Sequence, residues 1–252
     1  MTLSRPVLFI RLCFTGLLLS ISAPVMAENF DWQQWNSLLG EAVSGARREG
    51  VMLNVVDYPL VMKDVRYQET IQRLSKYDPA KIINRDDKLA FYINLYNIFA
   101  VKMVVDHWQP ESIRDIGGFF SSVWKKDVGI LGGESITLHE IEHEVLRPMG
   151  EPRIHFAIVC ASVSCPDLRR ETYRPDKLDS QLDEQTRMFL NNTAKGLRVK
   201  AGEIHISSIF DWFEQDFKPY GGVKQFIYKF RQDLPRRYAV ETDIPYNWRL
   251  NY

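Results

Sequence analysis

Cysteine is scarce in this sequence of 252 residues, and its scarcity limits the ways in which the chain can fold. Of three cysteines, Cys13 lies in an apolar N-terminal segment that we expect to be removed. The remaining pair, Cys160 and Cys165, is too small for a disulfide-stapled scaffold. The chain must therefore fold around a hydrophobic core, for which 6 tryptophans, 11 tyrosines and 14 phenylalanines supply large side chains.

An excess of charge of either sign is also missing. The full chain has 32 Lys+Arg and 32 Asp+Glu residues. Residues 1–27 hold two arginines and no acidic residue, so without them 30 basic residues face 32 acidic ones, a balance of −2. So small a charge gives no long-range attraction toward nucleic acid or an anionic membrane. We therefore expect no nucleic-acid partner. We also expect no cofactor, and the sequence leaves open an envelope protein or peptide as a partner.

A long apolar run occurs at the N-terminus alone, where the sequence has the three parts of a secretory signal. Two arginines precede an apolar stretch at 12–24, and residues 25–27 have the small to medium side chains of a cleavage site before Glu28. The stretch is shorter than the roughly 20 residues that a spanning helix needs. We predict a cleaved signal peptide at 1–27, no later transmembrane segment and a periplasmic or secreted protein; an uncleaved signal anchor is the alternative.

Repeats, low-complexity tracts and Pro/Gly/Ser-rich linkers are absent from residues 28–252, which we predict to form a single domain. The mixture of non-alternating elements favours an α+β class, mainly helical, with a small sheet. Residues 88–107 are apolar on nearly all sides, as expected of a buried central helix. The patterns predict further helices at 30–48, 112–116, 138–147, 178–190, 208–217 and 223–230, a buried strand at 153–159, and a hairpin of 197–199 and 204–206.

The residues best suited to chemistry are densest between Arg153 and Pro166. The predicted strand runs into a turn of small residues that holds two thiols and two hydroxyls: Cys160, Ser162, Ser164 and Cys165. Pro166 suits the first position of a helix, which would place Cys165 at a helix N-terminus. There the positive end of the helix dipole favours a thiolate, and free backbone amides could hold an oxyanion.

A nucleophilic cysteine also needs a base, for which two histidines are candidates. His155 and Cys160 face opposite sides of an ideal strand, so His143 is at least as suitable. Glu142 or Asn94 would orient the base. On this hypothesis the chain is a thiol-dependent hydrolase or transferase. If the two cysteines instead form a disulfide or stay buried and inert, the chain is a non-catalytic binding or assembly module.

A second constellation, at 139–143, matches the metal-binding pattern H-E-x-x-H. On a helix, His139 and His143 share a face and could bind one zinc ion, with Glu140 as general base and Glu171 or Glu184 as a distant third ligand. The glycine and third histidine of metzincins do not follow, and such a face is more often simply solvated. A zinc hydrolase is therefore the second alternative, and we assign no metal ligand.

Asn94 and Asn97 lie three residues apart on the apolar central helix, so at least one amide is expected to be buried. A buried amide without a hydrogen bond costs about 1–3 kcal/mol, so it should orient an imidazole or tie down a loop's backbone. The second role is the commoner one. Aromatic residues at helical spacing in 211–217 are interpreted as core in the same way.

Taken in order, these segments resemble the domain-of-unknown-function 547 family. The resemblance runs from about Leu74 to the C-terminus. It is carried by LAFYINLYN (89–97), SIRDI (112–116), 138–147 with its Ile-Glu-His, RIHFAIVCASVSCP (153–166), 209–217 and Tyr-Asn-Trp (246–248).

The family has no agreed activity, but the resemblance has two implications. Family members usually carry an acidic or amide residue where this chain has His139, so the H-E-x-x-H match is interpreted as accidental. Members also occur inside plant cells, where structural disulfides do not persist, which favours a role for Cys160 and Cys165 beyond stapling. This chain departs from the family pattern at Val159, often Asn, and at Asp167, often Pro, which puts a site using a polar group beside Cys160 in doubt.

Overall fold

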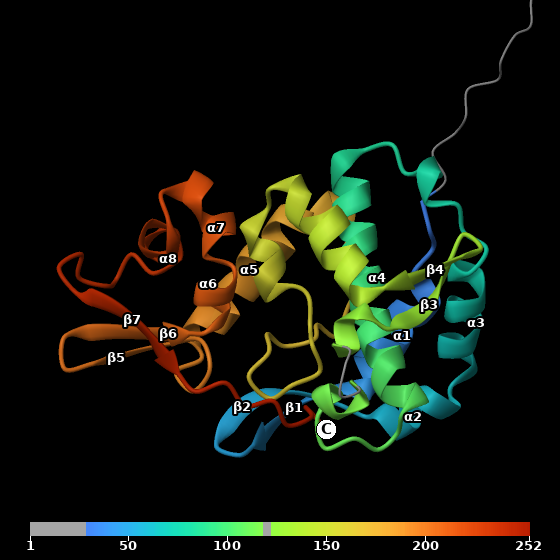
Figure 1. Cartoon of the computed structure of the whole chain (residues 1–252), viewed down its shortest axis with the longest axis horizontal. Helices are drawn as coiled ribbons and strands as arrows, with labels where there is room; N and C mark the ends of the chain where they lie inside the picture. The colour runs from blue at the N-terminus through green and yellow to red at the C-terminus, as the bar shows by residue number, and fades with distance from the viewer. Residues whose placement is uncertain (1–28, 118–121) are drawn as a thin grey trace, which may run out of the picture.

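The protein is built around one long helix, α4 (Arg85–Asp106), which is surrounded by shorter helices and small sheets (Figure 1). The computed structural model describes residues 29–117 and 122–252, so the predicted signal peptide at 1–27 lies outside the described residues. The α+β class is confirmed: helices predominate, and the strands form two hairpins and one three-stranded sheet in the described part of the chain.

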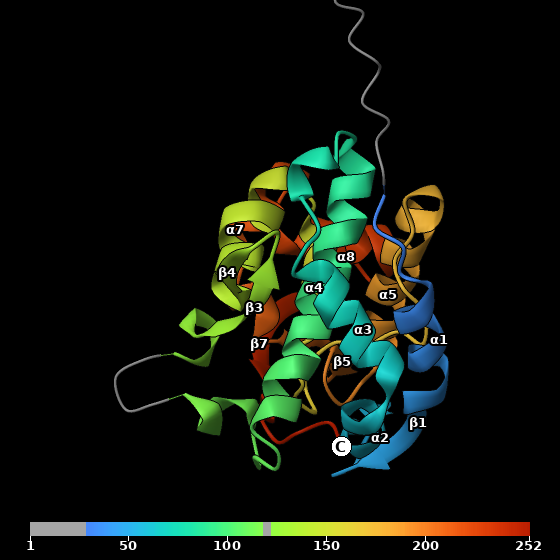
Figure 2. The same cartoon turned by 90° about the vertical axis from the view of Figure 1, so that its right-hand side faces the viewer.

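Helix α4 is buried on almost every side, as its composition predicts. Sixteen of its 22 residues are buried. Asp86 and Asp87 lie in the first turn, where their negative charges interact favourably with the positive end of the helix dipole. Its length and hydropathy would suit a membrane span, but 89% of its most apolar stretch is buried inside the protein. Such burial is what a core helix requires. Turned by 90°, the molecule shows α4 running through the middle, with α3 beside it (Figure 2).

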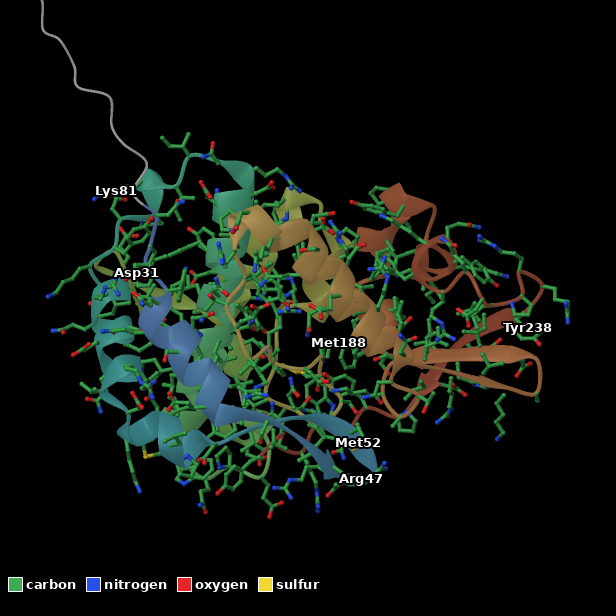
Figure 3. The ribbon with its side chains drawn as sticks, turned by 180° about the vertical axis from the view of Figure 1, so that it is seen from behind. Asp31, Arg47, Met52, Lys81, Met188 and Tyr238 are labelled. Carbon is green, nitrogen blue, oxygen red and sulfur yellow. A yellow bond between two sulfur atoms is a disulfide. The ribbon has the colours of Figure 1, made fainter. Side chains whose placement is uncertain are left out.

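The N-terminal part contains α1 (Gln33–Ala42), β1 (Val43–Arg48), β2 (Val51–Val56), α2 (Tyr58–Lys63) and α3 (Val65–Leu74). The prediction of one helix over 30–48 is wrong, because the helix ends at Ala42 and the chain continues as β1. Strands β1 and β2 pair as an antiparallel hairpin through Glu49 and Gly50, both with positive φ, as a two-residue turn requires. Arg47 and Met52 mark this hairpin in the view from behind (Figure 3).

A second hairpin, β3 (Asp127–Leu131) and β4 (Glu134–Thr137), lies against α4. The contact is close because Gly129 has no side chain: a Cβ there would lie 2.7 Å from the Phe99 ring. The chain then enters a π-helical segment, η4 (Glu140–Leu146), and a 3₁₀ turn, η5 (Arg147–Met149). A helix was predicted over 138–147, so its place is confirmed, but its turns are wider than those of an α-helix.

The C-terminal part has its own aromatic core. Helix α5 (Leu178–Asn191) and the β5–β6 hairpin (Leu197–Lys200 and Glu203–Ser207) confirm the prediction, and β7 (Ala239–Ile244) adds a parallel third strand in the order β5-β6-β7. Strand β7 was not predicted, because its residues are mostly exposed. The predicted helix at 208–217 is two short helices, α6 (Ile209–Trp212) and α7 (Glu214–Phe217), and α8 spans Val223–Phe230 as predicted.

The prediction of a strand at 153–159 is wrong. Residues Pro152–Phe156 form a 3₁₀ helix, η6, whose start is capped by the Glu151 carboxylate accepting the Arg153 N–H at 3.1 Å. Its buried apolar run resembles a core strand in composition, but these residues pack against α5 instead of pairing with a strand. The chain therefore enters the turn at Cys160 from the end of a 3₁₀ helix, Pro152–Phe156, and not from a strand.

Candidate functional site

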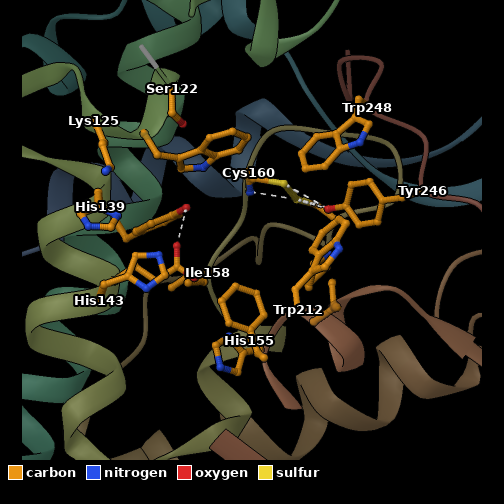
Figure 4. Close-up of a pocket in the computed structure, with 17 residues that line it drawn as sticks. Ser122, Lys125, His139, His143, His155, Ile158, Cys160, Trp212, Tyr246 and Trp248 are labelled. Atoms are coloured by element: carbon orange, nitrogen blue, oxygen red, sulfur yellow. Dashed lines mark hydrogen bonds between the residues drawn. A yellow bond between two sulfur atoms is a disulfide. The ribbon is translucent and has the colours of Figure 1, made fainter. Parts of the chain in front are cut away.

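A pocket of about 220 Å³ collects most of the residues that the sequence analysis singled out (Figure 4). We call one side the Glu142 wall, formed by Tyr96, His139, Glu142 and His143. The opposite side is the disulfide wall, formed by Cys160, Cys165 and Tyr246. The pocket is also lined by an aromatic rim, formed by Trp124, Trp212, Phe213 and Trp248, in which Trp212 and Trp248 lie beside Tyr246 (Figure 4).

The Glu142 wall is positioned by a capped π-helical segment. The predicted capping box is present: the Thr137 N–H donates to Glu140 Oε2 at 2.7 Å, and the Glu140 N–H donates to Thr137 Oγ1 at 3.1 Å. The His139 and His143 rings share one face, with centroids 4.4 Å apart. Turns of π-helix are rare and occur frequently at functional sites.

Glu142 is a buried carboxyl group, with only 6% of the residue exposed. Tyr96, from α4, donates its hydroxyl to Glu142 Oε2 at 3.4 Å. Burial raises the pKa of Glu142 to about 7, against the weaker opposing effects of the Arg147 charge and the Tyr96 hydroxyl. A carboxyl group that titrates near neutral pH inside a pocket can both take up and release a proton there.

His143 is held in its neutral form. Burial, with the positive charges of neighbouring groups, lowers its pKa to about 4. Arg147 Nη1 lies 2.8 Å from His143 Nδ1, and since a guanidinium only donates, Nδ1 must accept. The neutral ring therefore carries its proton on Nε2. His143 was predicted to be a base, but this arrangement makes it a hydrogen-bond donor.

Behind this wall, Asp216 ties Arg147 and His155 together. Arg147 Nε and Nη2 donate to its two oxygens at 2.7 and 2.9 Å, and His155 Nε2 donates to Oδ2 at 2.8 Å. Burial by itself raises the pKa of Asp216, but the bonds from His155 and Arg147 outweigh it and hold that pKa well below its usual range. Asp216 is thus the ionised anchor of the cluster.

His155, the other predicted base, is committed to this cluster. Its ring stacks on Phe213 at 4.0 Å between centroids, and burial lowers its pKa despite the bond to Asp216. The other ring nitrogen, Nδ1, is buried with no hydrogen-bond partner among the described residues. His155 lines the pocket, but it pairs with Asp216 and not with a cysteine.

The disulfide wall joins Cys160 to Cys165 through a disulfide bond. Cys165 Sγ accepts the Cys160 backbone N–H at 2.9 Å and the Tyr246 hydroxyl at 3.2 Å, while Ser162 donates to the Tyr246 oxygen at 3.3 Å. Pro166 was predicted to open a helix with Cys165 at its N-terminus. This is wrong: the chain stays irregular up to the 3₁₀ turn at Pro175–Lys177.

Side chains from distant elements fix the backbone on both sides of the disulfide. Asn97, on α4, donates Nδ2 to the Ala157 carbonyl at 3.0 Å and accepts the Val159 N–H at 2.9 Å. Lys195 is almost fully buried, and its Nζ donates at 2.6 Å both to the Cys165 carbonyl and to Asp167 Oδ1.

The C-terminal segment fixes the middle of the same turn. Its backbone groups pair with the turn through the Val163 N–H and the Ala161 carbonyl, and the Asn247 N–H donates to Ser164 Oγ at 2.8 Å. Ser164, one of the two hydroxyls of the predicted turn, therefore holds the backbone of the C-terminal segment. The turn is therefore positioned by hydrogen bonds that do not depend on the disulfide.

Asn94 lies outside the pocket. Its Nδ2 donates to the Tyr173 carbonyl and its Oδ1 accepts the Tyr173 N–H, both at 2.8 Å. Both Asn94 and Asn97 are buried, so the prediction of a buried amide that ties down a loop is confirmed twice. The orienting role suggested for Asn94 does not fit, because both ends of its amide are occupied by backbone.

The aromatic rim was missed as a functional feature. Trp212 and Trp248 stack with centroids 5.5 Å apart and 20° between planes, and Tyr246 lies 4.4 Å from Trp248. Trp212 is 45% exposed, which a core residue would not be. The signal was available, since 209–217 and 246–248 carry the family resemblance, but aromatic residues at helical spacing suggest core first.

The donor set does not fit a zinc centre. Glu140 is occupied by the capping box, and Glu171 and Glu184 both pair with Arg169. Across residues 29–117 and 122–252, no group of three or more His, Cys, Asp or Glu residues is arranged to hold a metal ion. The two histidines that remain, His139 and His143, would need a third ligand and face the Arg147 charge.

The fold and pocket define an α+β protein whose site combines a buried carboxyl group with a disulfide. Residues 80–190 match the model of a family described as "Protein of unknown function, DUF547", which confirms the resemblance to that family over this part of the chain. The match contains the Glu142 wall and both cysteines, but ends before Trp212, Tyr246 and Trp248. No curated protein and no solved structure matches the chain.

Proposed function

We propose that the pocket is an acid–base active site of the hydrolase or transferase type, with Glu142 as the proton-transferring group. The observation that carries the proposal is a carboxyl group, 6% exposed and with a pKa of about 7, on the wall of a pocket of substrate size. A group whose pKa lies near the working pH is the most effective general acid or base.

The neighbouring groups suit this carboxyl group to general-base catalysis. The Glu142 carboxylate takes a proton from a water molecule or hydroxyl, which then attacks an electrophilic centre. The Nε2–H of neutral His143 donates to the oxygen on which negative charge develops. Because the pKa of His143 is about 4, this donor stays neutral over the range in which Glu142 titrates. The aromatic rim favours a small substrate with a flat or ring-shaped group.

The proposal changes the roles predicted from sequence. A thiolate nucleophile was expected at Cys160 or Cys165, but the two sulfurs are bonded to each other. Glu142, expected to orient a histidine, becomes the proton-transferring group itself. His143, expected to be the base, becomes the donor.

The test uses p-nitrophenyl acetate, a small aromatic ester. Its hydrolysis by the mature protein should rise with pH through an apparent pKa near 7, and Glu142→Gln should lower the rate roughly a hundredfold. Glu144→Gln is the matched control, since Glu144 lies on the same helical segment but is exposed. Equal rates for the wild type and Glu142→Gln at every pH would remove the catalytic proposal.

The aromatic rim supports a second candidate function, a binding module without catalysis. Trp212 is exposed and stacks on the half-buried Trp248, an arrangement that could hold a ring-shaped ligand. In that case p-nitrophenol should quench the tryptophan fluorescence and Trp212→Ala should abolish the quenching, while no ester is turned over.

We also propose that the protein works in the periplasm or is secreted. The three-part N-terminal pattern supports export, and the Cys160–Cys165 disulfide suits an oxidising compartment. Mass spectrometry of protein from the periplasmic and extracellular fractions should find Glu28 as the first residue. Cytoplasmic protein that retains residues 1–27 would contradict the proposal.

A further inference from the structure

We infer that the Cys160–Cys165 disulfide is a reactive pair that exchanges with small thiols and disulfides entering the pocket. Both sulfur-bearing residues line the pocket, so a ligand there meets the disulfide directly. Access is unequal: Cys160 is half-buried, whereas Cys165 is only 2% exposed. An incoming thiolate therefore reaches the sulfur of Cys160 first.

The surroundings of Cys165 favour its departure as a thiolate. Its Sγ accepts the Cys160 N–H at 2.9 Å, a bond that Cys160 Sγ does not receive, and the Tyr246 hydroxyl lies 3.2 Å from both sulfurs. The Ser162 hydroxyl donates to the Tyr246 oxygen, so the Tyr246 proton faces the two sulfurs and can stabilise the thiolate that forms on Cys165. Burial raises the pKa of Tyr246, so the hydroxyl stays protonated. Hydrogen bonds to the charged form stabilise a thiolate and make it a better leaving group.

Exchange does not require the turn to unfold. Asn97, Lys195 and the C-terminal segment hold its backbone without using either sulfur. The disulfide joins residues only five positions apart, and the chain-entropy contribution of a disulfide falls as the closed loop shortens. A bond that contributes little to the fold and faces a pocket is better suited to exchange than to stapling.

The exchange is balanced in atoms and electrons. A thiolate attacks Cys160 Sγ, the bond between the two cysteines breaks, and its electron pair leaves on Cys165 Sγ. A second thiolate then attacks the outer sulfur of the mixed disulfide and releases the Cys160 thiolate. Two thiols are oxidised to one disulfide, Cys160 and Cys165 are reduced, and the two protons lost by the thiols go to the two cysteines. A disulfide co-substrate reverses both steps.

The aromatic rim indicates which chemical group the incoming thiol carries. Trp212, Trp248 and Tyr246 form a connected aromatic surface, and Tyr246 also contacts the disulfide through its hydroxyl. A flat group stacked on this surface lies beside the sulfurs. The preferred co-reactant is therefore a small thiol or disulfide with an aromatic group.

The first test uses an aromatic disulfide, 5,5′-dithiobis(2-nitrobenzoate), on folded single-cysteine variants. In Cys165→Ser the free Cys160 should form the mixed disulfide in the native state, identified by peptide mass. In Cys160→Ser the buried Cys165 should react at least tenfold more slowly. Equal reactivity of the two cysteines, or no reaction of Cys160 until the protein is unfolded, would overturn the inference.

The second test follows reduction of the oxidised protein by benzyl mercaptan, a thiol that carries an aromatic ring. Tyr246→Phe keeps the ring but removes the donor to the leaving thiolate, so reduction should slow roughly tenfold. Tyr173→Phe is the matched control, because the Tyr173 hydroxyl is also buried but has no hydrogen-bond partner among the described residues. Equal rates for Tyr246→Phe and wild type, with native fluorescence retained in both, would rule out the assigned leaving-group role.

Discussion

The two walls of the pocket differ in what their surroundings do: on one wall burial shifts the pKa values of the functional groups, and on the other hydrogen bonds fix the backbone. On the Glu142 wall, burial disfavours the charged forms of the functional groups: it raises the pKa of Glu142 and lowers the pKa of His143. On the disulfide wall, the surrounding groups make the contacts, and Asn97 and Lys195 fix the backbone around the sulfurs. The burial that brings the pKa of Glu142 near neutral pH therefore costs stability. On the disulfide wall the backbone is fixed by other groups, so the two sulfurs can be reduced without loss of the turn.

This difference decides how each wall should respond to mutation. Removing the functional group from the Glu142 wall should relieve an unfavourable burial. Removing a clamp from the disulfide wall should destabilise the protein, and removing the sulfurs should matter less.

The largest effect is expected from Lys195→Met. Its buried ammonium pairs with Asp167 and donates to the Cys165 carbonyl, so its loss leaves a partly buried carboxylate and a carbonyl without their partner. We expect the free energy of unfolding to fall by about 3–5 kcal/mol, measured by urea denaturation. Lys200→Met, at an exposed position of β5, should change it little. A similar small loss for both variants would show that Lys195 is not the clamp.

Glu142→Gln should change the pH dependence of stability. The pKa of Glu142 is raised from 4.5 to about 7 in the folded state, so its favourable contribution is complete below pH 4.5 and is lost as the pH rises through about 7. Between pH 4.5 and 8, the wild type should lose about 3 kcal/mol relative to Glu142→Gln. Glu144→Gln should follow the wild type. Parallel stability curves for the wild type and Glu142→Gln would contradict the raised pKa.

Removing the disulfide should have a smaller effect than removing the clamp. Cys160→Ala/Cys165→Ala should lower the free energy of unfolding by about 2 kcal/mol, since the closed loop is short. The measurement is urea denaturation of the oxidised wild type and the double variant at the same pH. A loss larger than that of Lys195→Met would make the disulfide a structural staple.

The smallest effect is expected from Arg147→Leu. Loss of the guanidinium removes both a nearby positive charge and the donor to Nδ1, so the pKa of His143 should rise from about 4 by about one unit. NMR titration of the imidazole resonances measures it. Arg73→Leu is the matched control, because Arg73 also lies over a phenylalanine ring but outside the pocket. An unchanged pKa in Arg147→Leu would contradict the tautomer assigned to His143.

The sequence predicts some features of the pocket because they follow from local pattern. Burial of α4, the capping box at Thr137 and the limits of α5 and α8 are set by side-chain periodicity and short-range hydrogen bonds. The candidate residues Glu142, His143, His155, Cys160 and Cys165 do line one pocket. Five of the six candidate residues therefore lie around one pocket, whereas Asn94 is bonded to the Tyr173 backbone outside it.

Their roles could not be predicted, because these depend on contacts between distant segments. Arg147 fixes the tautomer of His143 only because Asp216, 69 positions further along the chain, holds the guanidinium in place. Tyr246 reaches Cys165 across 81 positions. The same limit explains the strand expected at 153–159, since an apolar run does not show whether a strand or a helix will pack beside it.

The most direct test of the account is a titration of the Glu142 side chain itself. Carbon-13 NMR of residues 28–252 with labelled glutamate carboxyl groups, assigned by comparison with Glu142→Gln, gives the pKa of this one group. The account predicts a resonance that titrates with a pKa near 7, separate from the exposed glutamates. A Glu142 resonance that titrates near 4.5 would show that the carboxylate is ordinarily ionised at neutral pH, and the proposed acid–base site would lose its central group.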